Sequence, residues 1–85
     1  MLKRPALQAL IEAGAVRKMR LVARGANFHA EVETASGVVQ VAATGRGQPR
    51  QWRSLDAAAR WARDLGVGEI NVSISQWAPA QKGLL

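Results

Sequence analysis

Residues 19–33 read MRLVARGANFHAEVE, and this stretch decides the fold. Apolar side chains occupy every second position on both sides of the turn residues GAN: Met19, Leu21, Ala23, Phe28, Ala30 and Val32. A period of two is typical of half-buried strands. We therefore expect residues 15–24 and 28–33 to form an antiparallel hairpin with one apolar face and one wet face.

The alternation continues beyond this hairpin. After the turn residues ASG, a third strand is predicted with Val39, Val41 and Ala43 on its inner face. Residues 69–77, EINVSISQW, predict a fourth strand whose inward side chains are Ile70, Val72 and Ile74. If this alternation holds to its end, Trp77 lies on the opposite face and is partly exposed.

Two helices complete the pattern. Residues 5–13 begin with a proline, end before Gly14 and space apolar side chains at helical intervals. A second helix is predicted over residues 55–65, with Ser54 as its N-cap and Asp56 in its first turn. Its apolar stripe is Leu55, Ala58, Trp61, Ala62 and Leu65, and its opposite side carries the ladder Asp56, Arg60 and Asp64.

The elements follow one another in the order α-β-β-β-α-β, which predicts an α+β fold with the second helix on the apolar face of the sheet. Eighty-five residues make one domain with a modest core. The first helix, within residues 1–14, belongs either to that core or to a separate arm. Residues 78–85 are expected to form a loose tail.

Composition limits the functional classes. The chain has a formal net charge of +6, which suggests an anionic partner. It has no cysteine, so disulfides and thiolate metal sites are excluded. Its apolar runs are too short to span a bilayer, and a cytoplasmic setting is the expectation.

The most basic stretch is GRGQPRQWRS, residues 45–54. Arg46, Arg50 and Arg53 offer rigid forks of donors for phosphate, and Trp52 offers a face on which a base can stack. No acidic residue lies between Glu33 and Asp56 to neutralise them. The alternatives are a solvated connection and a Trp52 that packs in the core. A phosphate loop is not predicted, because the spacing matches no glycine-rich motif.

The wet face of the sheet is a second candidate for nucleic-acid contact, since Lys18, Arg20 and Arg24 point outward from the first strand. The outward positions of the next strand include Glu31 and Glu33, so a cross-strand charge network is expected instead. Arg17 and Arg24, near the strand ends, are the basic residues expected to escape this pairing.

Catalysis is not expected. His29 is the only histidine. No hydrogen-bonding partners can be identified that would orient His29, Glu31 and Glu33 as ligands of a metal. Thr34 and Ser36 form no nucleophile–base set with His29. We predict no metal, no cofactor and no enzymatic activity.

The segment RQWRSLDAAARWARDLGVGEINVSISQW, residues 50–77, is similar to the ParC family of plasmid partition-associated small proteins of Gram-negative bacteria. The resemblance covers about a third of the chain and implies a role in plasmid or mobile-element maintenance. Three antiparallel strands followed by a helix also resemble AP2-like and integrase arm-type DNA-binding domains. Glu31 and Glu33 depart from that pattern, because they would face the phosphates.

The leading hypothesis is a non-catalytic, basic, nucleic-acid-associated protein. Its expected contacts are Arg46, Arg50, Arg53, Trp52, Arg17 and Arg24, helped by Lys3 and Arg4 if these lie on the same side. The rival hypothesis is a protein-interaction module or homodimer that meets its partner through the sheet edge or Trp77, without binding nucleic acid.

Overall fold

The computed structural model describes residues 1–78 of the 85. Its elements in chain order are β1 (Leu2–Lys3), α1 (Arg4–Glu12), β2 (Val16–Arg24), β3 (Asn27–Thr34), β4 (Val39–Ala43), β5 (Gln51–Trp52), α2 (Leu55–Asp64) and β6 (Asn71–Ser73). Of the tail predicted for residues 78–85, all but Ala78 lies outside the described residues.

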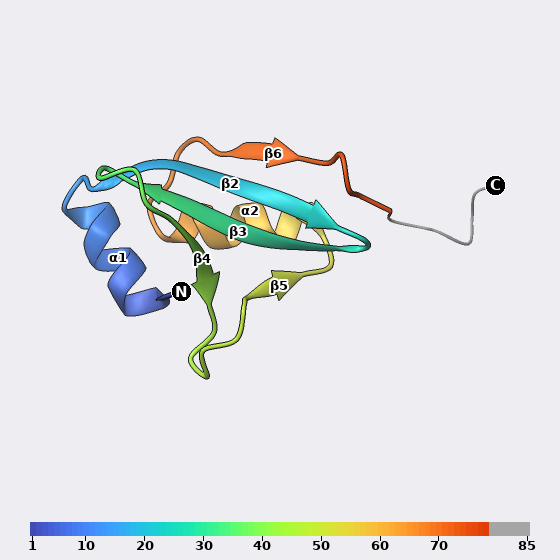
Figure 1. The fold of residues 1–85 in the computed structure, drawn as a ribbon, viewed down its shortest axis with the longest axis horizontal. Helices are drawn as coiled ribbons and strands as arrows, with labels where there is room; N and C mark the ends of the chain where they lie inside the picture. The colour runs from blue at the N-terminus through green and yellow to red at the C-terminus, as the bar shows by residue number, and fades with distance from the viewer. Residues whose placement is uncertain (79–85) are drawn as a thin grey trace.

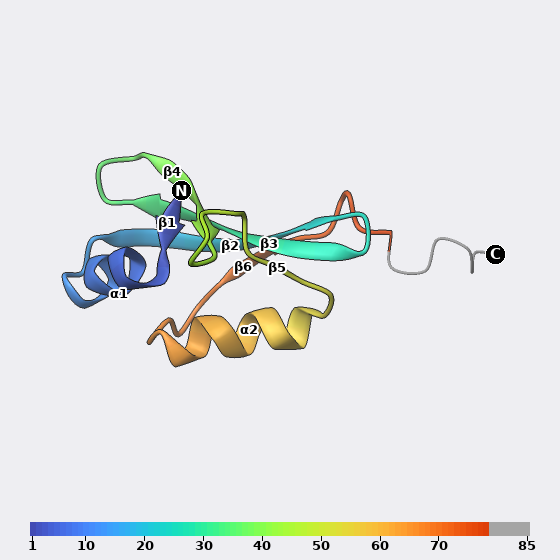
Figure 2. The same ribbon diagram turned by 90° about the horizontal axis from the view of Figure 1, so that it is seen from below.

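The strands form one mixed sheet in the order β1-β4-β3-β2-β6, with β5 paired to β3 (Figure 1). The central strands β2, β3 and β4 are an antiparallel meander. The outer strands β1 and β6 run parallel to their neighbours β4 and β2. Both helices lie on the same side of the sheet (Figure 2). The predicted α+β class and layout are confirmed, and the short strands β1 and β5 are additions to it.

The alternation of residues 19–33 sets the inner face of the sheet. Met19 is paired with Val32, Leu21 with Ala30, and Ala23 with Phe28. All six side chains are buried: Met19, Leu21, Ala30 and Val32 share one apolar cluster with residues of both helices, and Trp77 packs on Phe28. Burial of such apolar surface is the main favourable term in folding.

The predicted inner face of the third strand is wrong for Val39 and Val41, whereas the third predicted residue, Ala43, is buried. Val39 is paired with Glu33 and Val41 with Glu31, so both valines lie on the open face with the glutamates. Val39 is 51% exposed. The pairing with β3 decides which face of the sheet each β4 side chain occupies. A shift of this pairing by one residue would move every β4 side chain to the other face.

The last strand, Asn71–Ser73, is shorter than the predicted 69–77, and its predicted inner face is only partly covered, since Ile70 alone packs against the apolar cluster. Val72 is paired with the fully buried Leu21, yet Val72 itself is 42% exposed. Ile74, next along the segment, is 53% exposed. The reason is the position of α2, which packs against β3 and β5 and leaves β6 uncovered.

Trp77 also departs from the predicted alternation. A turn follows β6, in which the backbone N–H of Trp77 donates to the carbonyl of Ile74 at 3.0 Å. The Trp77 ring then lies 5.9 Å from the ring of Phe28, which is buried on the inner face. Trp77 therefore covers that end of the core while remaining 43% exposed.

Helix α1 is part of the core and not a separate arm. Leu7 is fully buried, and Leu2 of β1 belongs to the same apolar cluster. Leu10 and Ile11 pack against this cluster from the same helix. Within residues 1–78, no helix is long and apolar enough to cross a membrane.

Helix α2 begins at Leu55 as predicted and ends at Asp64, one residue before the predicted end, with Leu65 as its C-cap. The Ser54 Oγ accepts a hydrogen bond from the backbone N–H of Ala57 at 3.0 Å. Arg60 and Asp56 form an ion pair at 3.1 Å on the solvent side. Gly66 follows the C-cap with φ +99°, a conformation in which side chains are strained.

This cap leads to a first prediction. Ser54→Ala leaves an N–H of the first turn without its acceptor, and we expect it to lower the free energy of unfolding by about 1 kcal/mol. Urea denaturation followed by circular dichroism measures the change. Ser75→Ala, a matched substitution at an exposed turn position, should leave stability unchanged. An equal loss in both variants would contradict the capping role.

Candidate nucleic-acid interface

The N-terminus of α1 and the loop between β4 and β5 lie side by side. The cause is the parallel pairing of β1 with β4 (Figure 2), which places Leu2 beside Ala42 and Lys3 beside Ala43. Helix α1 begins at the next residue, Arg4. Two basic segments that are about forty residues apart in the sequence therefore meet at one edge of the sheet.

The loop itself is a hydrogen-bonded turn. The Thr44 hydroxyl oxygen accepts from the backbone N–H groups of Arg46 and Gln48, each at 3.3 Å. On the returning side, the N–H of Arg50 donates to the carbonyl of Ala42 at 2.9 Å. The arginine-rich stretch is therefore tied to the end of β4 at both of its arms.

A cavity of about 460 Å³ lies between these two segments. We call it the basic corner, and its lining residues are Lys3, Arg4, Pro5, Ala43, Thr44, Gly45, Arg50 and Trp61. Three of them are cations and none is acidic. The apolar side chains of Pro5, Ala43 and Trp61 complete a surface suited to an anionic group attached to a less polar body.

Arg50 lies over one aromatic ring, that of Trp52. Its guanidinium carbon lies 5.5 Å from the centroid of the Trp52 ring, within range of a cation–π interaction. Trp52 packs in turn on the buried Trp61, with ring centroids 4.8 Å apart. Trp52 is therefore partly core, as one alternative predicted. Its stacking limits the positions that the Arg50 donors can take.

The beginning of α1 adds positive potential to the basic corner. Its N-cap, Lys3, makes no side-chain cap hydrogen bond, and its first turn contains no acidic residue. Helix N-termini carry a partial positive charge and backbone donors that attract anions. Here the dipole adds to the charges of Lys3, Arg4 and Arg50 instead of being neutralised.

The other predicted contact residues are dispersed. Arg46 is at the loop tip beside Gly45, while Arg53 lies between β5 and the cap of α2; neither lines the cavity. Arg17 and Arg24 are at or near opposite ends of the nine-residue strand β2. The expectation that Arg17 escapes the charge network is wrong, because Arg17 forms an ion pair with Glu33 at 3.5 Å. The structure thus joins Arg50 to Lys3 and Arg4, but not to Arg17 or Arg24.

The open face of the sheet is a mixed-charge surface. Lys18 is paired with Glu33, and Arg20 with Glu31, across β2 and β3. His29 lies within 3.1 Å of Glu31 on β3. Opposite charges at paired positions attract and lower the net potential of a face. The basic corner therefore presents the more concentrated positive charge.

No metal centre is formed by the described residues. Within residues 1–78, no three side chains of the His, Cys, Asp and Glu types lie close enough together to hold an ion. The half-buried His29 is instead placed to share a hydrogen bond with Glu31.

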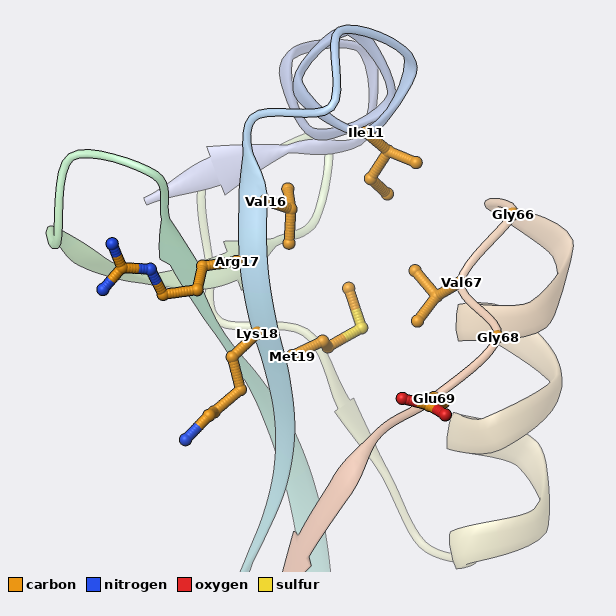
Figure 3. A pocket seen from close by; sticks show the side chains of 9 residues that line it. All are labelled: Ile11, Val16, Arg17, Lys18, Met19, Gly66, Val67, Gly68 and Glu69. Atoms are coloured by element: carbon orange, nitrogen blue, oxygen red, sulfur yellow. The ribbon is translucent and has the colours of Figure 1, made fainter.

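A second cleft lies between the start of β2 and the segment that follows α2 (Figure 3). Its volume is about 190 Å³. Ile11, Val16, Met19 and Val67 point into it, whereas Lys18 points away and Glu69 lies at its border. Its lining is thus mixed, with apolar side chains inside and the charged residues Arg17, Lys18 and Glu69 around them.

Comparison with known proteins adds no relative from which function can be transferred. No protein-family model matches the chain, and no curated protein or solved structure matches it. The resemblance to the ParC family stays a prediction.

Four residues of the basic corner were missed from the sequence: Pro5, Ala43, Thr44 and Trp61. Thr44 directly precedes the glycine–arginine stretch, which was a usable signal for a turn-building hydroxyl. Pro5 and Trp61 offered no such signal. They reach the cavity only through the β1–β4 pairing and the docking of α2.

Proposed function

We propose that this protein is a non-catalytic nucleic-acid-associated protein that holds the phosphate backbone at the basic corner. The observation that carries the proposal is the meeting of Lys3, Arg4 and Arg50 with the uncapped start of α1 around a cavity whose lining has no acidic residue. Arginine forks and helix N-termini are both common phosphate ligands.

Contacts between the basic corner and phosphate groups position the protein on a nucleic acid without reading its base sequence. Phosphate contacts fix orientation on the duplex, whereas sequence is read by contacts to base edges. Binding by one such corner is therefore weak and independent of sequence. The resemblance of residues 50–77 to plasmid partition-associated proteins suggests the setting, which is maintenance of a plasmid or mobile element.

The test is binding of the full chain to a fluorescent random-sequence duplex and to a single strand over a salt series. Each phosphate contact on duplex DNA contributes about −0.9 to the slope of log K against log salt. We expect the triple variant Lys3→Ala, Arg4→Ala, Arg50→Ala to reduce the steepness of that slope by up to about 2.7, with weaker binding at every salt concentration.

A matched control removes the same charge from the open face. Lys18→Ala, Arg20→Ala, Arg24→Ala also lowers the net charge by three, and we expect a smaller loss of affinity. A larger loss in this variant would move the interface to the sheet face. Unaltered binding by the corner variant would refute the proposal.

The loop-tip arginines need their own variant. Arg46→Ala, Arg53→Ala leaves the three corner cations in place. We expect it to keep most of the salt dependence, because neither side chain lines the cavity. If this pair instead accounts for the slope, the whole stretch of residues 45–54 is the binding element and Lys3 and Arg4 are incidental.

A further inference from the structure

Strand β6 is an uncovered edge of the sheet. It is the last strand in the order, and it pairs with β2 through Asn71, Val72 and Ser73. Within residues 1–78, no strand pairs with its other side. Unpaired backbone donors and acceptors on such an edge are a template for another strand.

Large apolar side chains extend along this edge. Val72, Ile74 and Trp77 are 42%, 53% and 43% exposed. We call these three residues the β6 patch. Clustered exposure of this kind is typical of interaction surfaces.

The charge pattern points to a second copy of the chain as the occupant. Residues 70–78 contain no charged residue, although the chain has 12 basic and 6 acidic residues. Edge strands that stay unpaired are usually protected by charges, most often lysine. Two copies with net charge +6 repel one another, and the repulsion is least where their contact is neutral. An acidic partner would gain more from the basic corner than from this neutral edge.

We propose that the protein forms a homodimer in which the β6 edges of two copies pair antiparallel about a two-fold axis. The two sheets then become one continuous sheet, and Val72 and Ile74 of each copy pack against those of the other. This is a self-complementary contact of the type found in two-fold dimers. It goes beyond nucleic-acid binding and does not depend on it.

Antiparallel pairing also provides a contact for the cleft of Figure 3. The C-terminal end of one β6 lies beside the N-terminal end of the other, so the exposed part of Trp77 approaches the partner copy's segment 66–69. The cleft opens there, with the apolar side chain of Val67 in its lining. The basic corners remain free, because β1 and β6 are at opposite ends of the strand order.

The first test is the solution mass of the chain, without nucleic acid, over a concentration series. We expect a shift from 9.1 kDa to twice that mass. Ile74→Lys should shift the midpoint at least tenfold towards higher concentration, because it places a charge at the pairing edge. Val39→Lys is the matched control, at 51% exposure on the other half of the sheet, and should leave the midpoint unchanged.

The second test is intermolecular disulfide formation, which is clean because the chain has no cysteine. A residue on a two-fold axis meets its own copy, so either Val72→Cys or Ser73→Cys should give a cross-linked dimer under mild oxidation. Ser36→Cys, exposed in the β3–β4 turn, should not. A chain that stays at 9.1 kDa, with no cross-link at positions 72 or 73, overturns the proposal and leaves another segment or another protein as the occupant.

Failure of the dimer would leave the basic corner untouched. If the dimer forms, two corners act on one nucleic acid and raise its affinity by avidity. In that case Ile74→Lys weakens nucleic-acid binding because it separates the two copies. Each basic corner should still make the same contribution to the slope of log K against log salt.

Discussion

Leu7→Ala is expected to lower the free energy of unfolding by about 2–5 kcal/mol, which is the usual cost of truncating a buried leucine. Leu7 is fully buried and belongs to the cluster that joins α1 to the sheet. A small domain has only about 5–15 kcal/mol of stability, so the loss is large. Urea denaturation monitored by circular dichroism measures this loss, because the free energy of unfolding is obtained from the midpoint and the slope of the transition.

Leu55→Ala makes the same chemical change at a position 38% exposed and should cost about 0.5 kcal/mol. Leu7→Met, which conserves volume, should cost less than about 1.5 kcal/mol and keep the protein folded if the alanine variant does not fold. A loss from Leu7→Ala no greater than that from Leu55→Ala would mean that α1 is an arm after all.

Trp61→Ala is the second large effect, at about 3–5 kcal/mol. The indole is buried between α2 and the sheet and packs on Trp52. Its loss removes both the apolar area of the ring and the aromatic pair. Thermal and urea unfolding report the stability, and near-ultraviolet circular dichroism reports the ring pair.

Trp61→Phe separates the core role from the site role. It keeps an aromatic ring against Trp52, so most of the stability should remain, and Arg50 keeps its ring partner. We therefore expect near-normal nucleic-acid binding from this variant. A cost below about 1 kcal/mol for Trp61→Ala would show that α2 is not held on the sheet by this residue.

The two effects concern the same region of the molecule. Leu7 holds α1 in place, and with it the positions of Lys3 and Arg4, whereas Trp61 supports Trp52 and Arg50. The basic corner is therefore a product of core packing. Any variant that unfolds the core will also lose binding, which is why the binding tests use exposed cations.

Local patterns predicted the elements well where one face is buried. The hairpin of β2 and β3 and the apolar stripe of α2 each repeat at the period of their secondary structure, and burial follows that period. The alternation of apolar residues was misleading at β4. Val39 and Val41 occupy every second position, as in a strand with a buried face, but their register with β3 places them on the open face. The same pattern was incomplete at β6, where Val72 and Ile74 alternate but no helix covers them.

The candidate site was only partly predictable. Arg50 was expected as a phosphate contact, and Lys3 and Arg4 were expected to help only if they lay on the same side. The cavity lining that joins these three depends on β1 and β4, where two residues of the first strand pair with two of the fourth. So short a pairing leaves no periodic signal, and its partner is distant in the sequence.

By itself, the sequence determined the two helices, the antiparallel meander, the net positive charge and the neutral stretch at residues 70–78. These properties depend on local periodicity, turn chemistry and composition, which act over a few residues. The tertiary structure alone decided which basic residues meet, which apolar side chains stay exposed and which sheet edge remains free. Those outcomes depend on strand order and on where α2 docks, and both are set by contacts between residues far apart in the chain.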